Sequence, residues 1–174
     1  MTDTFNETLR NWQNFYFMIG GAAAGLAGLI FVAVSLGMHR VTGEMEEDIN
    51  IFVSPSIFYF VLVLLLSCVM LVPIFTASIL ALILFLGGIV GLLKTTPIAR
   101  RLLRAAKKNQ DFDLWEHLTQ IILPVGSYGL ILVAALCFAV DQRSFAFFGT
   151  WISAILLLIC AISNTWSLVL WIIA

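Results

Sequence analysis

The chain has 174 residues, of which 61% are hydrophobic and 11% are charged, and its formal net charge is -1. Its mean hydropathy is +1.06, whereas ordinary soluble domains are about half apolar and about a quarter charged. A soluble fold of this length cannot bury so much apolar surface, and the balanced charge gives no general attraction to nucleic acid. The composition therefore predicts a single all-α membrane domain, a polytopic helix bundle that does not bind nucleic acid.

The number of crossings follows from the length of the apolar runs, which lie at about 15–38, 51–93, 119–140 and 144–173. As a single helix, the second run would be about 65 Å long, roughly twice the hydrocarbon core of a bilayer. It must therefore fold back, and Pro73 is the strong helix breaker near its middle. The sequence predicts five transmembrane helices, at about 15–38, 51–72, 74–93, 119–140 and 144–170.

Two further segments are expected to form short amphipathic helices at the membrane surface. Thr4 and Glu7 have the spacing of a capping box, and apolar residues follow at helical intervals. Thr96 and Pro97 have the pattern of an N-cap followed by a proline in the first helical turn. This pattern opens the basic segment 94–118, so we expect one interfacial helix before the first crossing and another in this segment.

Basic residues predict the orientation of the bundle, because short loops rich in Lys and Arg stay in the cytoplasm. The segment 94–118 carries most of them, and with five crossings Arg40 falls on the same side, against Arg10 and Arg143 on the other. We therefore expect a protein of the inner (cell) membrane with its N-terminus outside and its C-terminus in the cytoplasm. The basic segment is expected to bind membrane lipid or a protein partner through Arg100, Arg101, Arg104, Lys107 and Lys108.

Small residues recur at four-residue intervals in the first and third predicted helices. Lipid chains are as apolar as leucine, so helices associate in a bilayer through close backbone contact, which small residues allow. The first helix is therefore expected to be the one most enclosed by protein. Its small residues serve either packing within one chain or an interface between copies in a homo-oligomer. The residues concerned are Gly21, Ala24, Gly25 and Gly28 in the first helix and Gly87 and Gly91 in the third.

Uncharged polar groups supply the polar chemistry of the predicted crossings, because no Asp, Glu, Lys, Arg or His falls near the middle of one. Pro124 and Gly126 predict a bend in the fourth helix, which is either a fitted kink or a gate. A polar cluster near the end of the last helix is either a helix end or a contact between subunits. This cluster and one serine of the first helix are candidate pore-lining residues: Ser35, Ser163, Asn164 and Thr165.

Patterns typical of catalysis or cofactor binding are missing from the sequence. It has no GxSxG, HExxH, phosphate-binding loop or dinucleotide fingerprint. The three cysteines lie inside apolar runs without paired or metal-binding spacing, which predicts small buried hydrophobic residues. Asp111, Asp113, Glu116 and His117 are close together, but helix capping accounts for Asp113 and Glu116. We therefore expect no enzymatic activity, no cofactor and no metal.

Two short blocks resemble a broadly distributed family of small bacterial integral membrane proteins that has no assigned activity. The first block is WQNFY at 12–16 followed by GGAAAGLAGLIFVAVSL at 20–36, and the second is NTWSL at 164–168. The resemblance implies a bacterial inner-membrane protein with several helices. It transfers no function to any residue.

Two classes of function remain open from the sequence. The first is a homo-oligomeric channel, lined by hydroxyl, amide and backbone groups of the first or last helix and gated at apolar constrictions. The second is a nonconducting accessory or scaffold protein that binds a partner or anionic lipid through its cytoplasmic loops. Transport by rocking repeats is disfavoured, because five helices do not divide into equal halves.

Overall fold

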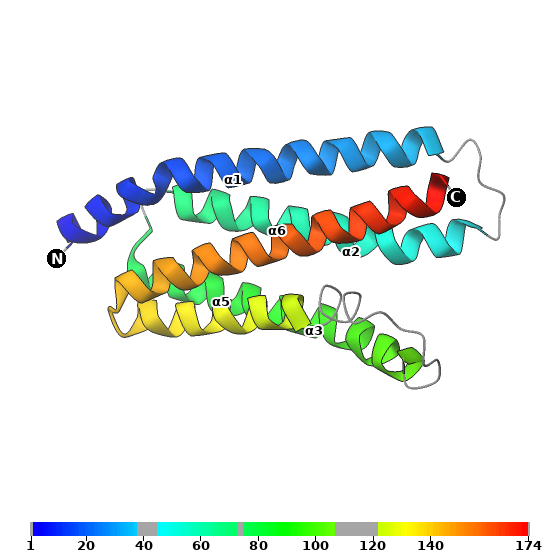
Figure 1. Ribbon diagram of the computed structural model, residues 1–174. Coiled ribbons are helices and arrows are strands. Elements are labelled where there is room, and N and C mark those ends of the chain that lie inside the picture. Colours follow the sequence, from blue (N-terminus) through cyan, green and yellow to red (C-terminus); the bar gives the residue numbers. More distant parts are fainter. Residues whose placement is uncertain (1, 38–44, 73–74, 107–121, 174) are drawn as a thin grey trace.

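A computed structural model of the chain describes residues 2–37, 45–72, 75–106 and 122–173, and it describes side chains within 10–35, 56–72, 75–96 and 122–166. In this part of the chain the secondary structure is all helical (Figure 1). The five helices are α1 (Thr2–Gly37), α2 (Met45–Leu71), α3 (Ala77–Ala106), α5 (Leu123–Ala139) and α6 (Arg143–Ile173). The all-α prediction is confirmed.

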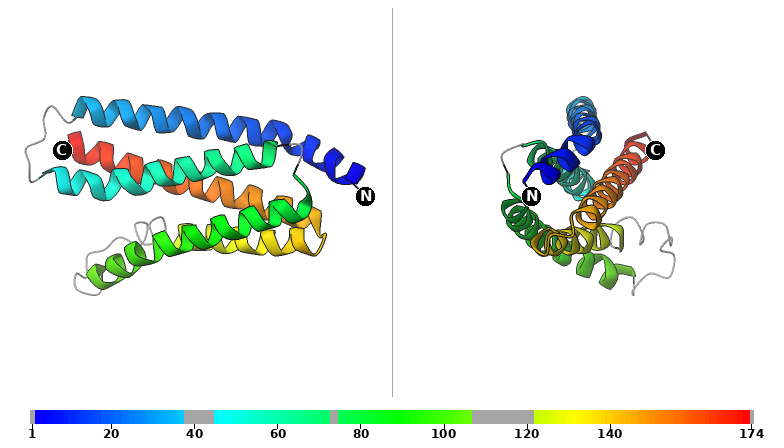
Figure 2. Two further views of the ribbon diagram at one scale, coloured as in Figure 1. Left: turned by 180° about the vertical axis from the view of Figure 1, so that it is seen from behind. Right: turned by 90° about the vertical axis from the view of Figure 1, so that its left-hand side faces the viewer.

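The helices lie alongside one another in a bundle whose order in space differs from the order in sequence (Figure 1). α1 packs against α2, α3 packs against α5, and α6 packs against both α2 and α5. α2 and α3 follow each other in the sequence but have little direct contact. The end-on view in Figure 2 shows α1 and α3 on opposite sides of the bundle, so α6 joins two pairs of helices.

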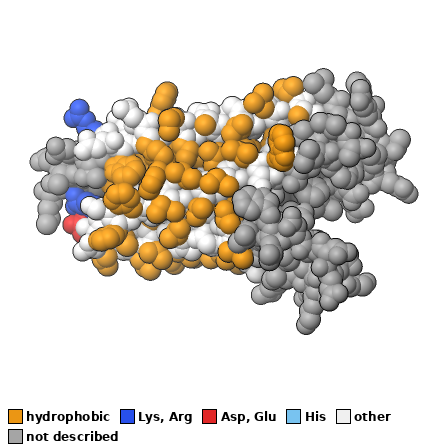
Figure 3. All heavy atoms as spheres, viewed as in Figure 1, with side chains coloured by type: hydrophobic (Ala, Val, Ile, Leu, Met, Phe, Trp, Pro, Cys, Tyr) orange, Lys and Arg blue, Asp and Glu red, His pale blue; other side chains and the backbone are white. Residues whose placement is uncertain are grey.

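Three of the described helices are long and apolar enough to cross a membrane, which indicates a membrane protein. Their apolar sections are Arg10–Ser35, Ala77–Thr96 and Arg143–Trp166, whereas Ser56–Leu71 and Leu123–Ala139 are shorter. On the face shown in Figure 3, apolar side chains cover the middle of the described part, and the charged side chains in view lie at one end. This distribution matches a bilayer around the middle of the bundle.

Three helices continue beyond the apolar runs from which they were predicted, and one of them is α2, which begins at Met45 and not at about residue 51. α1 begins at Thr2, so the expected N-terminal amphipathic helix is not separate from the first crossing. α3 continues through Pro97 to Ala106, so Thr96 is not an N-cap, and its hydroxyl instead donates to the Leu92 carbonyl at 2.5 Å. Hydropathy locates the section of a helix that lipid can cover, and a helix can continue into water past that section.

The breaks between helices occur close to the predicted positions. α2 ends at Leu71 and α3 begins at Ala77, on either side of Pro73, which itself lies outside the described residues. α5 and α6 are joined by a tight turn in which Asp141 has a φ of 61°. Asp and Asn tolerate this left-handed conformation better than most residues. The Asp141 carboxylate also accepts a hydrogen bond from Arg143 Nε at 2.6 Å, which holds the turn at the start of α6.

An aromatic cluster joins α1 to α6 near the start of the bundle. The Trp12 ring stacks on Phe147, with centroids 6.0 Å apart and an interplanar angle of 7°. Phe148 and Trp151 meet the same indole at 5.6 Å and 6.4 Å. Such ring pairs add to the stability that apolar contact provides. Direct contact between α1 and α6 is limited, so this cluster makes up much of it.

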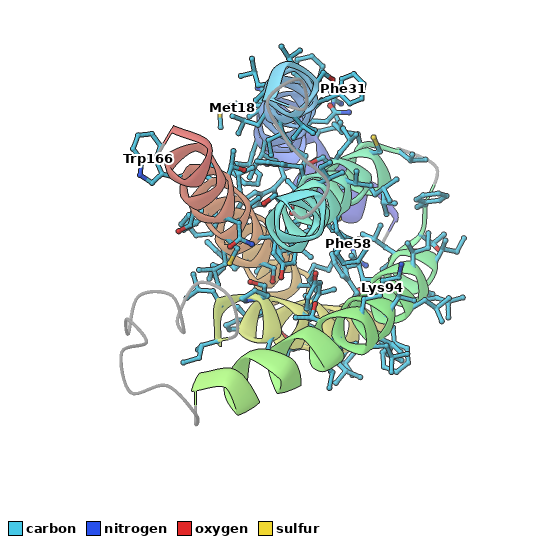
Figure 4. The ribbon with its side chains drawn as sticks, turned by 90° about the vertical axis from the view of Figure 1, so that its right-hand side faces the viewer. Met18, Phe31, Phe58, Lys94 and Trp166 are labelled. Atoms are coloured by element: carbon cyan, nitrogen blue, oxygen red, sulfur yellow. The ribbon has the colours of Figure 1, made fainter. Side chains whose placement is uncertain are left out.

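The expectation that the first helix is the most enclosed by protein is wrong for a single chain. Only 22% of the α1 span is buried inside the bundle, against 28% for α3 and 44% for α6. The physical reason is that α1 lies at the edge of the bundle and packs along its length against α2 alone. Met18 and Phe31 lie on two sides of α1, and both side chains are largely exposed (Figure 4).

Candidate functional site

Charged groups are confined to the ends of the apolar sections in the part of the chain whose side chains are described. Arg10, Asp141 and Arg143 lie at one end of the bundle. Lys94 lies near the other end of the α3 span, with its Nζ atom 5.4 Å from the centroid of the Phe58 ring, a cation–π contact between α3 and α2 (Figure 4). The polar chemistry inside the bundle is therefore that of uncharged groups.

A hydroxyl pair ties α1 to α6 inside the bundle. Tyr16 and Thr150 are both fully buried, and their oxygens are 2.7 Å apart. Thr150 Oγ1 also lies 2.9 Å from the Phe147 carbonyl and 3.1 Å from the Ala146 carbonyl. Because a threonine in a helix donates its proton to a carbonyl one turn back, the Tyr16 hydroxyl is the donor to Thr150.

A second polar contact joins α5 to α6 where their backbones approach closely. Gly149 permits this approach, because a β-carbon there would lie 3.1 Å from the Ala134 methyl group. The Ser153 hydroxyl lies 3.0 Å from the Ser127 carbonyl on α5 and 2.9 Å from the Gly149 carbonyl on its own helix. Hydroxyl-to-carbonyl bonds between helices of this kind are common in membrane bundles.

Polar groups from four helices meet in what we call the tyrosine cluster. Its members are buried and share electrostatic contacts, and they are Tyr59 on α2, Thr95 on α3, Tyr128 on α5 and Cys160 on α6. The Thr95 hydroxyl is within hydrogen-bonding range of both tyrosine hydroxyls. The Tyr128 hydroxyl is nevertheless fully buried without a well-formed hydrogen bond. The helices α2, α3, α5 and α6 each contribute one described polar side chain to the cluster.

The polar residues proposed as a pore lining occupy different environments. Ser35 is exposed on α1 and donates to the Phe31 carbonyl at 2.7 Å. Thr165 is half-buried and donates to the Ala161 carbonyl at 2.7 Å, and Ser163 is also half-buried. Asn164 is buried, one turn beyond Cys160 on α6. Their burial ranges from exposed to buried, and their role as a pore lining stays a prediction.

The glycines of α3 are divided between the interior and the surface. Gly91 is buried, and the Tyr128 ring lies so close that a side chain at residue 91 would overlap it. Gly88 likewise accommodates Leu132 of α5, at 2.8 Å from where a β-carbon would lie. Gly87 is exposed, and a β-carbon there would meet no other residue within 4 Å. Gly88 and Gly91 thus form the contact between α3 and α5.

The small residues of α1 lie mostly on its outer surface. Gly21, Ala24, Gly25 and Gly28 are all exposed. A β-carbon at any of the three glycines would have nothing within 4 Å. Gly20 is the exception, because a β-carbon there would lie 2.8 Å from Ser67 Cβ of α2. The repeated spacing of this helix is therefore unused within one chain.

Pro124 occupies the first turn of α5, where a proline leaves no helical hydrogen bond unmade. It is buried, and Gly126 is exposed with open space around it. A kink would require helix on both sides of the proline, and residues 107–121 lie outside the described part. The bend at Pro124 and Gly126 stays a prediction.

The basic segment extends α3. Arg100, Arg101 and Arg104 belong to the last turns of this helix, with side chains outside the described set. Lys107 and Lys108 lie wholly outside the described residues, as does the acidic and histidine group at 111–117. Among the residues described, no three His, Cys, Asp or Glu side chains come together as they would around a metal ion.

Sequence reasoning missed Tyr16, Tyr59 and Thr95 as interior polar groups. A usable signal was present, because a tyrosine in the middle of an apolar helix must bring its hydroxyl to a partner when buried. Tyr16 and Tyr59 both fit that description, and both are at most 2% exposed. Thr95 gave no such signal, since it adjoins Lys94 at the edge of an apolar run.

Comparison with protein-family models, curated proteins and solved structures finds no match to this chain. Function must therefore be inferred from the arrangement of its own residues. The two features available are the buried hydroxyl groups and the exposed small-residue face of α1.

Proposed function

We propose that the protein is a homo-oligomeric integral membrane protein whose copies meet through α1. The supporting observation is the exposed row on this helix that we call the glycine seam, made of Gly21, Gly25, Gly28, Val32 and Ser35. These residues are spaced four, three, four and three positions apart, the spacing of a helix that packs against another helix along its whole length. Glycines in such a seam allow two backbones to come close in lipid.

The glycine seam lies on the opposite side of α1 from the residues that contact α2. Ile19, Ala23 and Ile30 are buried in the core, whereas Gly21, Gly25 and Gly28 face away from it. One α1 can therefore pack against its own α2 and against a second α1 at the same time. A twofold arrangement of two such helices is the simplest closed assembly, because each presents the same surface to the other.

All five helices are proposed to cross the membrane. α5 has 17 residues, which span about 26 Å, close to the ~30 Å hydrocarbon core. α2 has 27 residues, enough to span it fully. The basic end of α3, with Arg100, Arg101 and Arg104, is proposed to lie in the cytoplasm. The N-terminus is then outside, in a cell membrane that the two-block resemblance suggests is bacterial.

The function that we infer is that of a nonconducting accessory or scaffold protein. Two observations support it. The interior of one bundle is filled by aromatic rings, by apolar side chains and by hydroxyls such as those of Thr150 and Ser153, which bond to backbone carbonyls. Two α1 helices joined through glycines would lie too close together to leave a lumen between them. The basic end of α3 would then hold anionic lipid or a protein partner.

A channel between copies is the second candidate, and Ser35 is the observation that favours it. This serine is exposed and lies seven residues after Gly28 on the glycine seam. A ring of several α1 helices would place serine hydroxyls and glycine backbone around a central axis, a lining that suits ion passage without charged residues.

The assembly is tested by substituting Gly25 with leucine, which fills the glycine seam. The matched control is Ala22→Leu, because Ala22 is also exposed on α1 but lies outside the seam. The number of copies is measured by single-molecule photobleaching in liposomes. We expect several copies for the wild type and the control, and single copies for Gly25→Leu. A monomeric wild type, or an unaffected Gly25→Leu variant, would contradict the proposal.

The two functions are separated by ion flux across liposomes that contain the assembled protein. The scaffold proposal expects flux equal to that of empty liposomes while the copy number stays above one. The channel proposal expects flux above this background that changes when Ser35 is replaced by valine. Assembled protein with Ser35-dependent flux would overturn the scaffold proposal.

A further inference from the structure

The Tyr128 hydroxyl is the most unusual polar group in the described part of the bundle. Its side chain is 1% exposed, and the oxygen has no well-formed hydrogen bond. Buried polar groups in native proteins almost always have a partner, from the protein or from an ordered water. The ring belongs to a helix that packs between α3 and α6, so bulk water does not reach it.

Ser67 has the same lack of a partner but a different explanation. Its hydroxyl is also buried and unbonded. A serine inside a helix can reach the carbonyl one turn back by rotating a single bond, so rotation alone can supply its partner. A tyrosine hydroxyl stands at the far end of a rigid ring and cannot reach the backbone of its own turn. The missing partner of Tyr128 must therefore come from outside its helix.

The ring of Tyr128 is also fixed in place. It lies directly against Gly91, at a distance that no side chain there would permit. Thr95 is one turn further along α3, and its hydroxyl is a neighbour of that of Tyr128. To move closer to Thr95, the ring would have to slide along α3, against which it is already tightly packed at Gly91. The packing between α3 and α5 therefore leaves the Tyr128 hydroxyl without a well-formed hydrogen bond.

We propose that an ordered water molecule binds in the tyrosine cluster and bridges Tyr128 to Tyr59, Thr95 and Cys160. A buried water needs two to four polar partners, and this cluster supplies three hydroxyls and a thiol. None of these groups carries a charge, so a neutral molecule suits the site better than an ion does. The water joins α2, α3, α5 and α6 at one point in the apolar interior.

The test is radiolytic labelling of the protein in lipid nanodiscs, followed by mass spectrometry. X-rays split water into hydroxyl radicals, which add oxygen to side chains beside a bound water even where bulk solvent is excluded. Tyr16 is the internal control, because it is equally buried but its hydroxyl is already paired with Thr150. We expect Tyr128 and Tyr59 to be labelled several-fold faster than Tyr16. Labelling of Tyr128 at the rate of Tyr16 would overturn the proposal.

Two further measurements distinguish a bound water from a general opening of the bundle. After rapid mixing into water enriched in oxygen-18, label at Tyr128 should retain the original isotope longer than label on a soluble tyrosine peptide added to the same solution. Immediate exchange would show solvent entry and reject an ordered water. In the variant Tyr128→Phe, labelling of Tyr59 should fall while that of Tyr16 is unchanged. Unchanged labelling of Tyr59 would also reject the bridge.

Discussion

α1 and α3 carry the same GxxxG spacing and lie on opposite sides of the bundle, yet they use it differently. On α3, Gly91 of the GxxxG pair and the neighbouring Gly88 face α5 and hold side chains of that helix at short range, whereas Gly87 of the pair is exposed. On α1, Gly21 and Gly25 face away from every described residue of the chain. The spacing therefore shows that a close approach is possible. Whether the partner belongs to the same chain depends on how the helix is rotated in its bundle.

The difference follows from which helices lie beside the glycine-bearing faces of α1 and α3. α5 lies beside α3 with Tyr128 and Leu132 on the facing side, so the space beside Gly88 and Gly91 is filled from within the chain. α1 has α2 on one side, and there Gly20 and Ala23 already provide the small residues for close contact. The remaining glycines of α1 have no role in the fold of one copy, which is why assembly is the proposal that they support.

The largest effect is expected from Gly91→Ala. The added methyl group would overlap the Tyr128 ring, and overpacking of this kind costs about 1–3 kcal/mol. Gly87→Ala is the matched control, because it lies one turn away on the same helix in open space. Reversible unfolding in mixed micelles should show this decrease in the free energy of unfolding for Gly91→Ala. For Gly87→Ala the free energy of unfolding should change by no more than about 0.5 kcal/mol. Equal losses of stability in the two variants would show that Gly91 does not determine the contact between α3 and α5.

A smaller effect is expected from Gly20→Ala on the inner face of α1. The new β-carbon would lie 2.8 Å from Ser67 Cβ, but α1 is an edge helix and can move outward, so we expect about 1 kcal/mol. Ser67→Gly removes the obstructing atom and should restore part of the stability of Gly20→Ala. Gly21→Ala, on the outer face, should leave unfolding of the single chain unchanged. A double variant no more stable than Gly20→Ala would contradict the contact.

The smallest effect is expected at the hydrogen bond that joins α1 to α6. Tyr16→Phe removes the donor to Thr150, and side-chain hydrogen bonds between membrane helices contribute about 0.6 kcal/mol on average. The double-mutant cycle of Tyr16→Phe with Thr150→Val should give a coupling free energy of this size in the same unfolding measurement. A coupling near zero would mean that the aromatic cluster around Trp12 alone joins these helices.

The helices were predictable because each apolar run has the length of a bilayer crossing, and Pro73 divides the one run that is too long. Their ends were not, since α3 passes Lys94 and continues to Ala106 with charged residues that water solvates. Which helices pack against one another could not be predicted from the sequence either. α2 and α5 are apolar on all faces, so no pattern along either helix shows that α6 will lie between them.

The polar interior was predictable in part. Uncharged polar groups were expected to supply the polar chemistry of the crossings, and the structure places Thr150, Ser153, Ser127 and Tyr128 in the core. Their partners did not stand out, because Tyr16 meets Thr150 across 134 positions of sequence. A contact over that distance depends on the rotation of two helices about their axes, which neither helix determines alone.

The central place of α6 has a consequence for how the molecule is made. The chain emerges from the ribosome with α1 and α2, and later α3 and α5, able to pair, but those two pairs have little surface in common until the last helix is present. Nascent chains that end before residue 143 would remain as two independent hairpins in the bilayer, open to membrane-bound proteases. Completion of the final segment is thus the step that turns separate pieces into one structure.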